Sequence, residues 1–500
     1  MKSVSCEKLL YEKSTPGRSG WSAGRLDVPE HPIEEIIPTR FLRSTPAELP
    51  QVSELDVVRH FTRLSQLNAS IDTHFYPLGS CTMKYNPRVN ERAARLPGFP
   101  SLHPYAPLQD VQGVLELLNL LQEYLCEITG MDAFTLHPAA GAQGEYVGIL
   151  VAKAFHEANG QARTRIIVPD TAHGTNPASA HLGGFEVVTL KSNLRGRTSL
   201  EELKAALDER VALFMLTNPN TLGLFEDDIL EISSLVHDAG SLLYLDGANL
   251  NALVGIVRPG DLGFDIVHVN THKTLSTPHG GGGPGAGPVG VTRQLAGFLP
   301  GVQIVVGDAG TYDLEKPENS IGALRCFLGS VGVLIRAYSY LRSLGSEGLR
   351  SQSRAAILNA NYLLASLKDF LEPYVDEPCM HECVLSSKRL KADGVRAMDI
   401  AKRLLDYGVH PPTAYFPLIV EEALMIEPTE AENRETMDVF IRAIGSILEE
   451  ARANPETVRT APHSTPVGRL DEVKAAREPV LTWKAAVSPA AKSQPCGALD

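Results

Sequence analysis

Between residues 108 and 270, short apolar runs alternate with segments in which apolar residues recur every three or four positions. The first pattern predicts buried strands, and the second predicts amphipathic helices. The predicted strands are 165–168, 185–190, 211–216, 241–245 and 266–269. The predicted helices are 108–129, 146–158, 171–180, 200–210 and 229–239. Gly130 and Gly240 follow two of these helices as C-caps. Alternation of strand and helix predicts a mostly parallel sheet covered by helices, the α/β class.

The pattern differs on both sides of this region. Residues 1–50 are rich in Pro, Gly and Ser, which indicates either an arm lying over another surface or a disordered tail. Residues 51–70 predict a helix, and long helices at 330–344 and 350–371 open a smaller α+β region. We therefore expect four parts: an N-terminal arm and helical segment at 1–105, a large domain at 106–325, a small domain at 326–455 and an extended tail at 456–500.

Lys273 stands at the end of the last predicted strand of the large domain and precedes the glycine-rich run Gly280–Gly283. An ammonium is costly to bury, and one common solution is a Schiff base between the lysine and an aldehyde cofactor. The glycine run lacks the Gly-Lys-Ser/Thr ending of a nucleotide-binding loop, so we interpret it as a permissive exit from the lysine.

Other polar residues fall where a pyridoxal phosphate enzyme needs them, because ligands of such sheets bind at the carboxyl ends of strands. Asp246 closes a strand and is expected to keep the ring nitrogen protonated, while Ala248 leaves room for the ring. His173 is a candidate for stacking on the ring, and Asn218 or Thr221 for bonding its hydroxyl. Taken singly, such an aspartate is more often a helix cap, and such a histidine is more often a core or surface residue.

The phosphate has a candidate cradle in the small-residue turn Ala140-Gly141-Ala142-Gln143, which opens a predicted helix. Backbone N–H groups at a helix start bind anions, although the same turn also fits an ordinary tight turn. Ser276, Thr277 and His279 are further candidates for phosphate contact. Residues 76–87 form a loop with hydroxyl, thiol and amine groups, which is either a linker or an active-site segment.

Composition limits the function further. The chain has 500 residues and a formal net charge of -13, so it is a poor candidate for binding nucleic acid. Seven cysteines, an odd number, indicate reduced thiols and a cytoplasmic location. Cys379, His381 and Cys383 allow a metal clip, but we expect no metal because no second pair has ligand spacing. The N-terminus lacks the apolar stretch of a signal peptide, and no apolar run is long enough for a membrane helix.

The chain resembles the pyridoxal-phosphate glycine decarboxylases of the glycine cleavage system, the P-proteins, and more narrowly subunit 2 of their two-chain form. The resemblance spans most of the chain. It is carried by Tyr76-Pro-Leu-Gly-Ser-Cys-Thr-Met-Lys84, His137-Pro-Ala-Ala-Gly-Ala-Gln-Gly-Glu145, Ala172-His-Gly-Thr-Asn-Pro-Ala178, Asp246-Gly-Ala-Asn249, His272-Lys-Thr274, Pro278-His-Gly-Gly-Gly-Gly-Pro-Gly285, Glu427-Pro-Thr429, and in the tail Ala461-Pro-His-Ser-Thr-Pro466 with Arg469-Leu-Asp471.

The resemblance implies a fold-type I, aminotransferase-like enzyme with Lys273 as the cofactor lysine and His272 beside it in the cofactor site. It implies decarboxylation of glycine and transfer of the aminomethyl group to the lipoyl arm of the H-protein. The implied partners are subunit 1, in an α2β2 assembly, and the T- and L-proteins of the system. Ser80, Cys81, Thr82 and Lys84 become candidates for substrate or entrance contacts. An aminotransferase, a relative of the cysteine desulfurases, and a non-catalytic scaffold half remain alternatives.

Overall fold

The computed structural model describes residues 7–22, 24–45, 47–103, 105–281, 285–307 and 310–482. The chain divides into two compact units, residues 1–70 with 460–500, and residues 71–459. Gly282, Gly283 and Pro284 of the motif quoted above lie outside the described residues, as do two of the seven cysteines, Cys6 and Cys496. The predicted tail is described only as far as residue 482.

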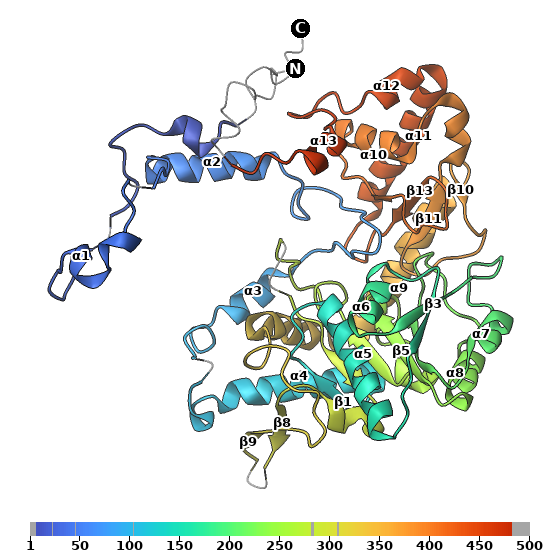
Figure 1. Cartoon of the computed structure of the whole chain (residues 1–500). Coiled ribbons are helices and arrows are strands. Elements are labelled where there is room, and N and C mark those ends of the chain that lie inside the picture. Colours follow the sequence, from blue (N-terminus) through green and yellow to red (C-terminus); the bar gives the residue numbers. More distant parts are fainter. Residues whose placement is uncertain are drawn as a thin grey trace. The chain divides into compact units, whose positions relative to one another are not determined.

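A seven-stranded sheet forms the centre of the 71–459 unit (Figure 1). Its strands are β1 (Ala133–Thr135), β2 (Arg165–Pro169), β3 (Glu186–Leu190), β4 (Val211–Thr217), β5 (Leu242–Gly247), β6 (Ile266–Val269) and β7 (Val289–Val291). The spatial order is β1-β7-β6-β5-β4-β2-β3. Strands β2 to β6 run parallel, and β7 pairs antiparallel with both β6 and β1. The five predicted strands are present, whereas β1 and β7 were not predicted, because each has only three residues.

Helices cover both faces of this sheet, as the alternating pattern predicts. They are α4 (Gln112–Thr129), α5 (Gly141–Ala158), α6 (Thr175–Leu182), α7 (Leu200–Ala206) and α8 (Ile229–Asp238). Leu243 and Leu245 of β5 pack in the cluster that contains residues of α4, α7 and α8. Leu242 and Tyr244 of the same strand pack in the cluster that contains residues of α5 and α6. Because side chains alternate along a strand, every central strand contributes to both cores.

Gly130 ends α4 in the left-handed conformation (φ 74°), and its N–H donates to the Cys126 carbonyl. The predicted C-cap is therefore confirmed. The helix begins at Gln112, because residues Leu108–Asp110 form a separate 3-10 turn. A short hairpin of β8 (Gln303–Val306) and β9 (Tyr312–Glu315), which the hydrophobic pattern did not indicate, follows the sheet.

The small domain is an antiparallel four-stranded sheet in the order β10-β11-β13-β12. Its strands are β10 (Glu372–Pro373), β11 (Cys383–Ser386), β12 (Thr413–Ala414) and β13 (Ala423–Ile426). Its helices are α10 (Ala397–Asp406), α11 (Arg434–Ala453) and α12 (Pro455–Arg459). These elements and the end of α9 (Val331–Leu367) share one apolar core. A mostly parallel large domain followed by a smaller α+β domain is thus confirmed.

Helix α9 contains a break at Gly345, where φ is 60° and ψ is -174°. The two long helices predicted at 330–344 and 350–371 correspond to its two segments. Its first segment packs against α3 (Arg88–Ala94) and α4. Its second segment, from Ala360 to Leu367, is buried in the core of the small domain. The element therefore belongs to both domains.

The other unit contains α1 (Ile33–Ile36), α2 (Glu54–Gln66) and α13 (Glu472–Arg477). Ser53 caps α2 by accepting a hydrogen bond from the Asp56 N–H at 3.1 Å. Leu55, Val58 and Phe61 of this helix are exposed. Within the residues that the structure describes, no helix combines the length and apolarity that crossing a membrane requires.

Candidate active site

Lys273, Asp246 and Asn218 follow neighbouring strands of the large sheet. In the register of the sheet, Thr217 of β4 pairs with Asp246 of β5, and Asp246 pairs with His268 of β6. Because these strands are parallel, their carboxyl ends lie side by side. Lys273 stands in the turn after β6, where its N–H donates to the Asn270 carbonyl at 3.1 Å. Its side chain is buried.

Asp246 is held by three groups. Its Oδ2 accepts a hydrogen bond from Asn176 Nδ2 at 2.9 Å, and its Oδ1 accepts one from the Ala248 N–H at 3.0 Å. His268 Nε2 lies 3.4 Å from Oδ1. Burial by itself would raise the pKa of Asp246, but His268, Asn176 and the charge of Lys273 outweigh it and leave the pKa lowered. A buried carboxylate that stays ionised suits a cationic ring nitrogen.

His268 is a site residue that the sequence analysis missed. It points from β6 toward Asp246, and its Nδ1 lies 2.7 Å from the Tyr244 hydroxyl. The residue is completely buried among apolar neighbours in the strand Ile266–Val269. A histidine inside a β-branched run of a central strand was the available signal, because burying a polar ring requires a partner.

His173 lies in the turn before α6, with its Nδ1 2.8 Å from Thr175 Oγ1. Thr175 Oγ1 also donates to Glu145 Oε1 of α5 at 2.8 Å, so the turn is tied to the neighbouring helix. The His173 ring contacts Phe416 edge-on, with 5.7 Å between centroids. These contacts fix the orientation of the imidazole while leaving it partly exposed.

The turn Ala140–Gln143 opens the 18-residue helix α5. Ala140 is the N-cap in an extended conformation and provides no side-chain cap, so N–H groups of the first turn stay available. Gln143 Oε1 accepts the Ala139 N–H at 2.6 Å. A Cβ on Gly141 would collide with Asn270 Oδ1, and one on Gly287 with the Ala140 carbonyl. The glycines thus let three backbone segments approach closely.

Several buried polar atoms around these residues have no hydrogen-bond partner among the described residues, namely Asn176 Oδ1, Asn218 Nδ2, Asn249 Oδ1, Asn270 Oδ1 and Thr274 Oγ1. Unpaired buried polar atoms are rare and call for a ligand. Thr221 Oγ1, the alternative to Asn218, already donates to the Thr171 carbonyl at 2.5 Å. These unpaired polar atoms, the Asp246 carboxylate and the N-terminus of α5 together fit pyridoxal phosphate.

His272 lies against His279, with ring centroids 4.8 Å apart. Burial and the neighbouring cations lower the pKa of His272 to about 3, so it is neutral. The hydroxyls of Ser276 and Thr277, considered above for phosphate contact, are engaged within the chain. Ser276 Oγ donates to the Tyr85 carbonyl at 2.5 Å, and Thr277 Oγ1 to Thr271 Oγ1 at 3.1 Å.

The loop that contains Ser80, Cys81, Thr82 and Lys84 lies against the Lys273 segment. His279 Nε2 is 2.9 Å from the Cys81 carbonyl. Lys84 Nζ donates to the Thr274 carbonyl at 3.0 Å, and Asn86 Nδ2 to the Ser276 carbonyl at 2.9 Å. The loop is therefore packed onto the segment that carries the lysine.

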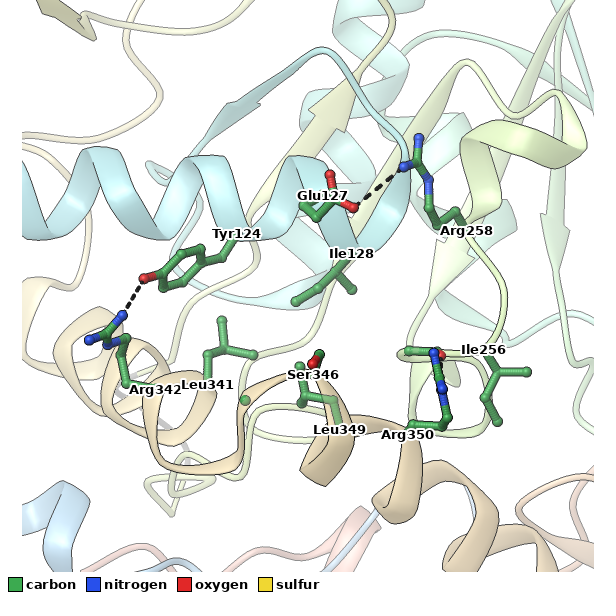
Figure 2. Close-up of a pocket in the computed structure, with 12 residues that line it drawn as sticks. Tyr124, Glu127, Ile128, Ile256, Arg258, Leu341, Arg342, Ser346, Leu349 and Arg350 are labelled. Atoms are coloured by element: carbon green, nitrogen blue, oxygen red, sulfur yellow. Dashed lines mark hydrogen bonds and ion pairs between the residues drawn. The ribbon is translucent and has the colours of Figure 1, made fainter.

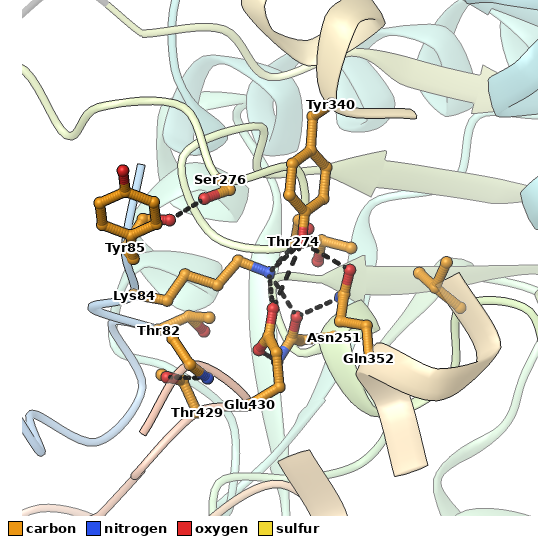
Figure 3. A network of polar contacts seen from close by, with 12 residues as sticks. Thr82, Lys84, Tyr85, Asn251, Thr274, Ser276, Tyr340, Gln352, Thr429 and Glu430 are labelled. Atoms are coloured by element: carbon orange, nitrogen blue, oxygen red, sulfur yellow. Dashed lines mark hydrogen bonds and ion pairs between the residues drawn. The ribbon is translucent and has the colours of Figure 1, made fainter. Parts of the chain in front are cut away.

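Lys84 is completely enclosed by this packing (Figure 3). Besides Thr274, its ammonium contacts Glu430 Oε1 at 2.7 Å, Asn251 Oδ1 at 2.9 Å and the Tyr340 hydroxyl at 3.3 Å. Burial lowers the pKa of Lys84, and the charge of Glu430 opposes this shift. With every hydrogen engaged inside the chain, Lys84 is placed to support the site rather than to reach a substrate.

Ser80 and Thr82 bind two buried glutamates of the small domain. The Ser80 N–H donates to Glu382 Oε2 at 2.8 Å, and the Thr82 N–H to Glu427 Oε2 at 2.9 Å. His381 lies beside Glu382, with 3.6 Å from Nε2 to Oε1. Among the described residues, Cys379 and Cys383 join no group with metal-ligand spacing; His381 groups with the two glutamates instead. The described cysteines, including Cys81, are free thiols.

A groove of 540 Å³ lies elsewhere, bordered by α4, α9 and residues 255–258 (Figure 2). Arg342 donates to the Tyr124 hydroxyl at 3.0 Å, and Arg258 lies 3.6 Å from Glu127 across the groove. None of the candidate site residues predicted from the sequence lines it. The chemistry therefore concentrates at the strand ends and not in this groove.

Comparisons with known proteins identify the family of the chain. The family model for the glycine cleavage system P-protein matches residues 26–313, and that for the glycine dehydrogenase C-terminal domain matches residues 352–465. A probable glycine dehydrogenase (decarboxylating) subunit 2 from Caldanaerobacter subterraneus subsp. tengcongensis is 58% identical over 95% of this chain and 98% of its own. A similar protein from Halalkalibacterium halodurans is 55% identical over 96% and 98%.

Among solved structures, an inhibitor-bound glycine decarboxylase (P-protein) of the glycine cleavage system aligns with a TM-score of 0.70 and 23% identity. The alignment covers 83% of this chain and 94% of that one, and at this identity it shows the fold alone. The fold is therefore fold-type I, as the sequence motifs imply. With a matching family model over more than half its length and relatives of this identity, the chain belongs to the P-protein family of the glycine cleavage system.

Proposed function

We propose that this chain is the cofactor-bearing subunit that decarboxylates glycine and passes the aminomethyl group to the lipoyl arm of the H-protein. The observation that carries this is the placement of Lys273 and Asp246 on adjacent parallel strand ends in a chain of this family. The cofactor is pyridoxal 5'-phosphate, which when bound supplies an electron sink for the pair released as the Cα–carboxylate bond of glycine breaks.

The residues have distinct roles in this proposal. Lys273 holds the cofactor covalently at rest, and its amine becomes a proton carrier when glycine replaces it. Asp246, ionised and backed by His268, keeps the ring nitrogen protonated. Asn218 Nδ2, which has no partner among the described residues, donates to the ring oxygen, with Ala248 close to the ring.

The remaining groups hold the ends of the cofactor. The N–H groups at the start of α5, in the turn Ala140–Gln143, bind the phosphate. His173 covers the ring, held by Thr175. His272, neutral at physiological pH, adds a polar contact without adding charge. Ser80, Cys81 and Thr82 border the substrate side.

Subunit 2 of a two-chain enzyme works with a subunit 1, and glycine is the substrate. We extend this to an α2β2 assembly, to exchange with a lipoylated H-protein and to a functional link with the T- and L-proteins. We also place the enzyme in the cytoplasm, because the described cysteines are free thiols. A site that serves a carrier arm must open to the surface, and the loop 76–86 is our candidate for its rim.

The decisive experiment reconstitutes this chain with subunit 1, pyridoxal phosphate and lipoylated H-protein. We expect ¹⁴C-bicarbonate to exchange into the carboxyl group of glycine, and borohydride reduction to label Lys273. Lys273→Ala should remove both signals. Transamination without exchange would instead support an aminotransferase. Unchanged system activity in Lys273→Ala would support the scaffold alternative.

A further inference from the structure

Three buried groups of the small domain meet where the loop 76–86 crosses it. Glu382 precedes β11 and Glu427 follows β13, and these strands pair with Cys383 opposite Ile426. The two glutamates therefore occupy the next positions of the same ladder. One oxygen of each and one ring nitrogen of His381 lie within 4.8 Å of one another. All three side chains are completely buried.

The backbone of the loop 76–86 is bent where it donates hydrogen bonds to these carboxylates. Besides the two backbone N–H donors described above, Thr82 Oγ1 donates to Glu427 Oε1 at 2.5 Å. Ser80 and Thr82 take positive φ angles of 63° and 50°. This conformation is unfavourable for a residue other than glycine, and most of all for a β-branched one. Strained backbone that aims donors at two carboxylates is typical of a functional site.

Part of the cluster is left without a partner. Within the described part of the chain, Glu382 Oε1 and both ring nitrogens of His381 make no hydrogen bond. No lysine or arginine among the described residues forms an ion pair with either glutamate. Two carboxylates this close and this buried cannot both be ionised, so they retain a proton.

The charged groups around the two glutamates support a retained proton. The groups that face the pair are Lys273, Lys84, Glu430, Cys81, Cys379 and His381. Burial raises the pKa of Glu427 to about 7, and burial with the charge of Glu427 raises that of Glu382 well above its usual range. Lys273 opposes both shifts. Burial lowers the pKa of His381 to about 3, so the imidazole is neutral.

The pair is also linked to the cofactor lysine through the loop. The segment 80–82 binds the glutamates on one side, while the Cys81 carbonyl contacts His279 and Lys84 contacts the Thr274 carbonyl on the other. The glutamate pair, which stores a proton, and the Lys273 amine, which must change its protonation, thus lie in one enclosed region.

We propose that Glu382 and Glu427 hold one proton between them and act as the acid–base pair for exchange of glycine with Lys273. The inference rests on the proposed function. Glycine arrives as an ammonium, and its nitrogen attacks only after losing a proton. The N–H bond breaks, its electron pair stays on glycine, and an O–H bond forms on the pair. That O–H bond then breaks, and the proton forms an N–H bond on the amine of Lys273 as it is released.

The test follows glycine binding to the holoenzyme assembled with subunit 1, without H-protein, by the visible absorbance change of the bound cofactor. In the wild type the rate should rise with pH around the pKa of Glu427, about 7. Glu427→Gln should lose this rise and slow the step by roughly 10²- to 10⁴-fold. Glu382→Gln should also slow the step, because one of the two carboxyl groups that share the proton is lost. The rise should stay near pH 7, since Glu382 is still protonated when Glu427 ionises.

Glu226→Gln is the matched control. Glu226 is equally buried, and burial raises its pKa to about 7, but its carboxylate pairs with the Thr198 N–H at 3.0 Å, and Lys273 is not among the groups that shift its pKa. This variant should keep the wild-type profile. A profile in Glu427→Gln that matches both the wild type and this control would overturn the proposal.

Two further measurements test the proposal if Glu427→Gln does not fold. A wild-type rate in Glu382→Gln would overturn it. The same side chains could instead bind a metal ion, and metal analysis of the holoenzyme tests this. One bound divalent ion in the wild type that is absent in Glu382→Gln would show that a metal, and not a proton, occupies the cluster. Normal pH-dependent glycine binding without bicarbonate exchange would contradict the proposed function and leave the acid–base pair intact.

Discussion

The ammonium of Lys84 lies 2.7 Å from Glu430 Oε1, and the Lys84 side chain is only 1% exposed. The same ammonium donates to the carbonyl of Thr274, the residue after Lys273. One buried cation therefore neutralises a carboxylate and also fixes the backbone beside Lys273. These two effects can be separated by substitution.

Lys84→Met should lower the free energy of unfolding of the apo chain by about 3 kcal/mol, because it leaves the partly buried Glu430 without its counter-charge. The double variant Lys84→Met/Glu430→Gln should recover most of that loss. Cofactor affinity should stay several-fold weaker in both, since the bond to Thr274 is absent in each. Denaturant unfolding and spectral titration measure the two quantities. Full recovery of affinity in the double variant would argue against a positioning role.

Asp246→Asn should keep the fold and bind cofactor but slow bicarbonate exchange by roughly 100- to 1,000-fold, because a neutral amide no longer stabilises the protonated ring nitrogen. The rate is measured at saturating cofactor. Asp261→Asn, at a 63% exposed side chain paired with Arg258, is the control and should leave the rate unchanged. Wild-type exchange in Asp246→Asn would remove the aspartate from the mechanism.

Gly141→Ala should weaken cofactor binding at least about tenfold and destabilise the chain by about 1–3 kcal/mol, because the new Cβ meets Asn270 Oδ1. Gly113→Ala provides the contrast at an exposed position of α4. A Cβ there meets nothing within 4 Å, and α4 should gain about 0.5–1 kcal/mol. Equal effects of the two substitutions on cofactor binding would show that the turn is not the phosphate cradle.

The raised pKa of Glu226 predicts that the free energy of unfolding of the chain depends on pH. Burial raises its pKa to about 7 from 4.5, so between these values the folded chain keeps a proton that the unfolded chain has released. Stability contributed by this group is present at low pH and is lost as pH rises through this window. The stability of Glu226→Gln relative to the wild type should therefore increase by up to about 3 kcal/mol between pH 4.5 and 7. Urea titrations at several pH values measure this difference, and a constant difference would contradict the pKa.

The sequence by itself determined the strand–helix alternation, the two domains and the residues at the ends of β4, β5 and β6. Each of these depends on local information: the period of apolar positions, a glycine after a helix, or a polar residue closing an apolar run. Lys273 and Asp246 were therefore candidates before any fold was known. The three-residue strands β1 and β7 were not, because they are too short to show a period.

Only the tertiary structure decided which polar groups face one another. Thr82 and Glu427 are 345 positions apart, and Lys84 and Glu430 are 346 apart, yet each pair is bonded in the interior. His268 supports Asp246 only because β5 and β6 are adjacent in register. Local periodicity contains no information about such pairings, since they arise when separate elements pack against one another. The second set of titratable groups, Glu382, Glu427 and His381, therefore became visible only in the folded chain.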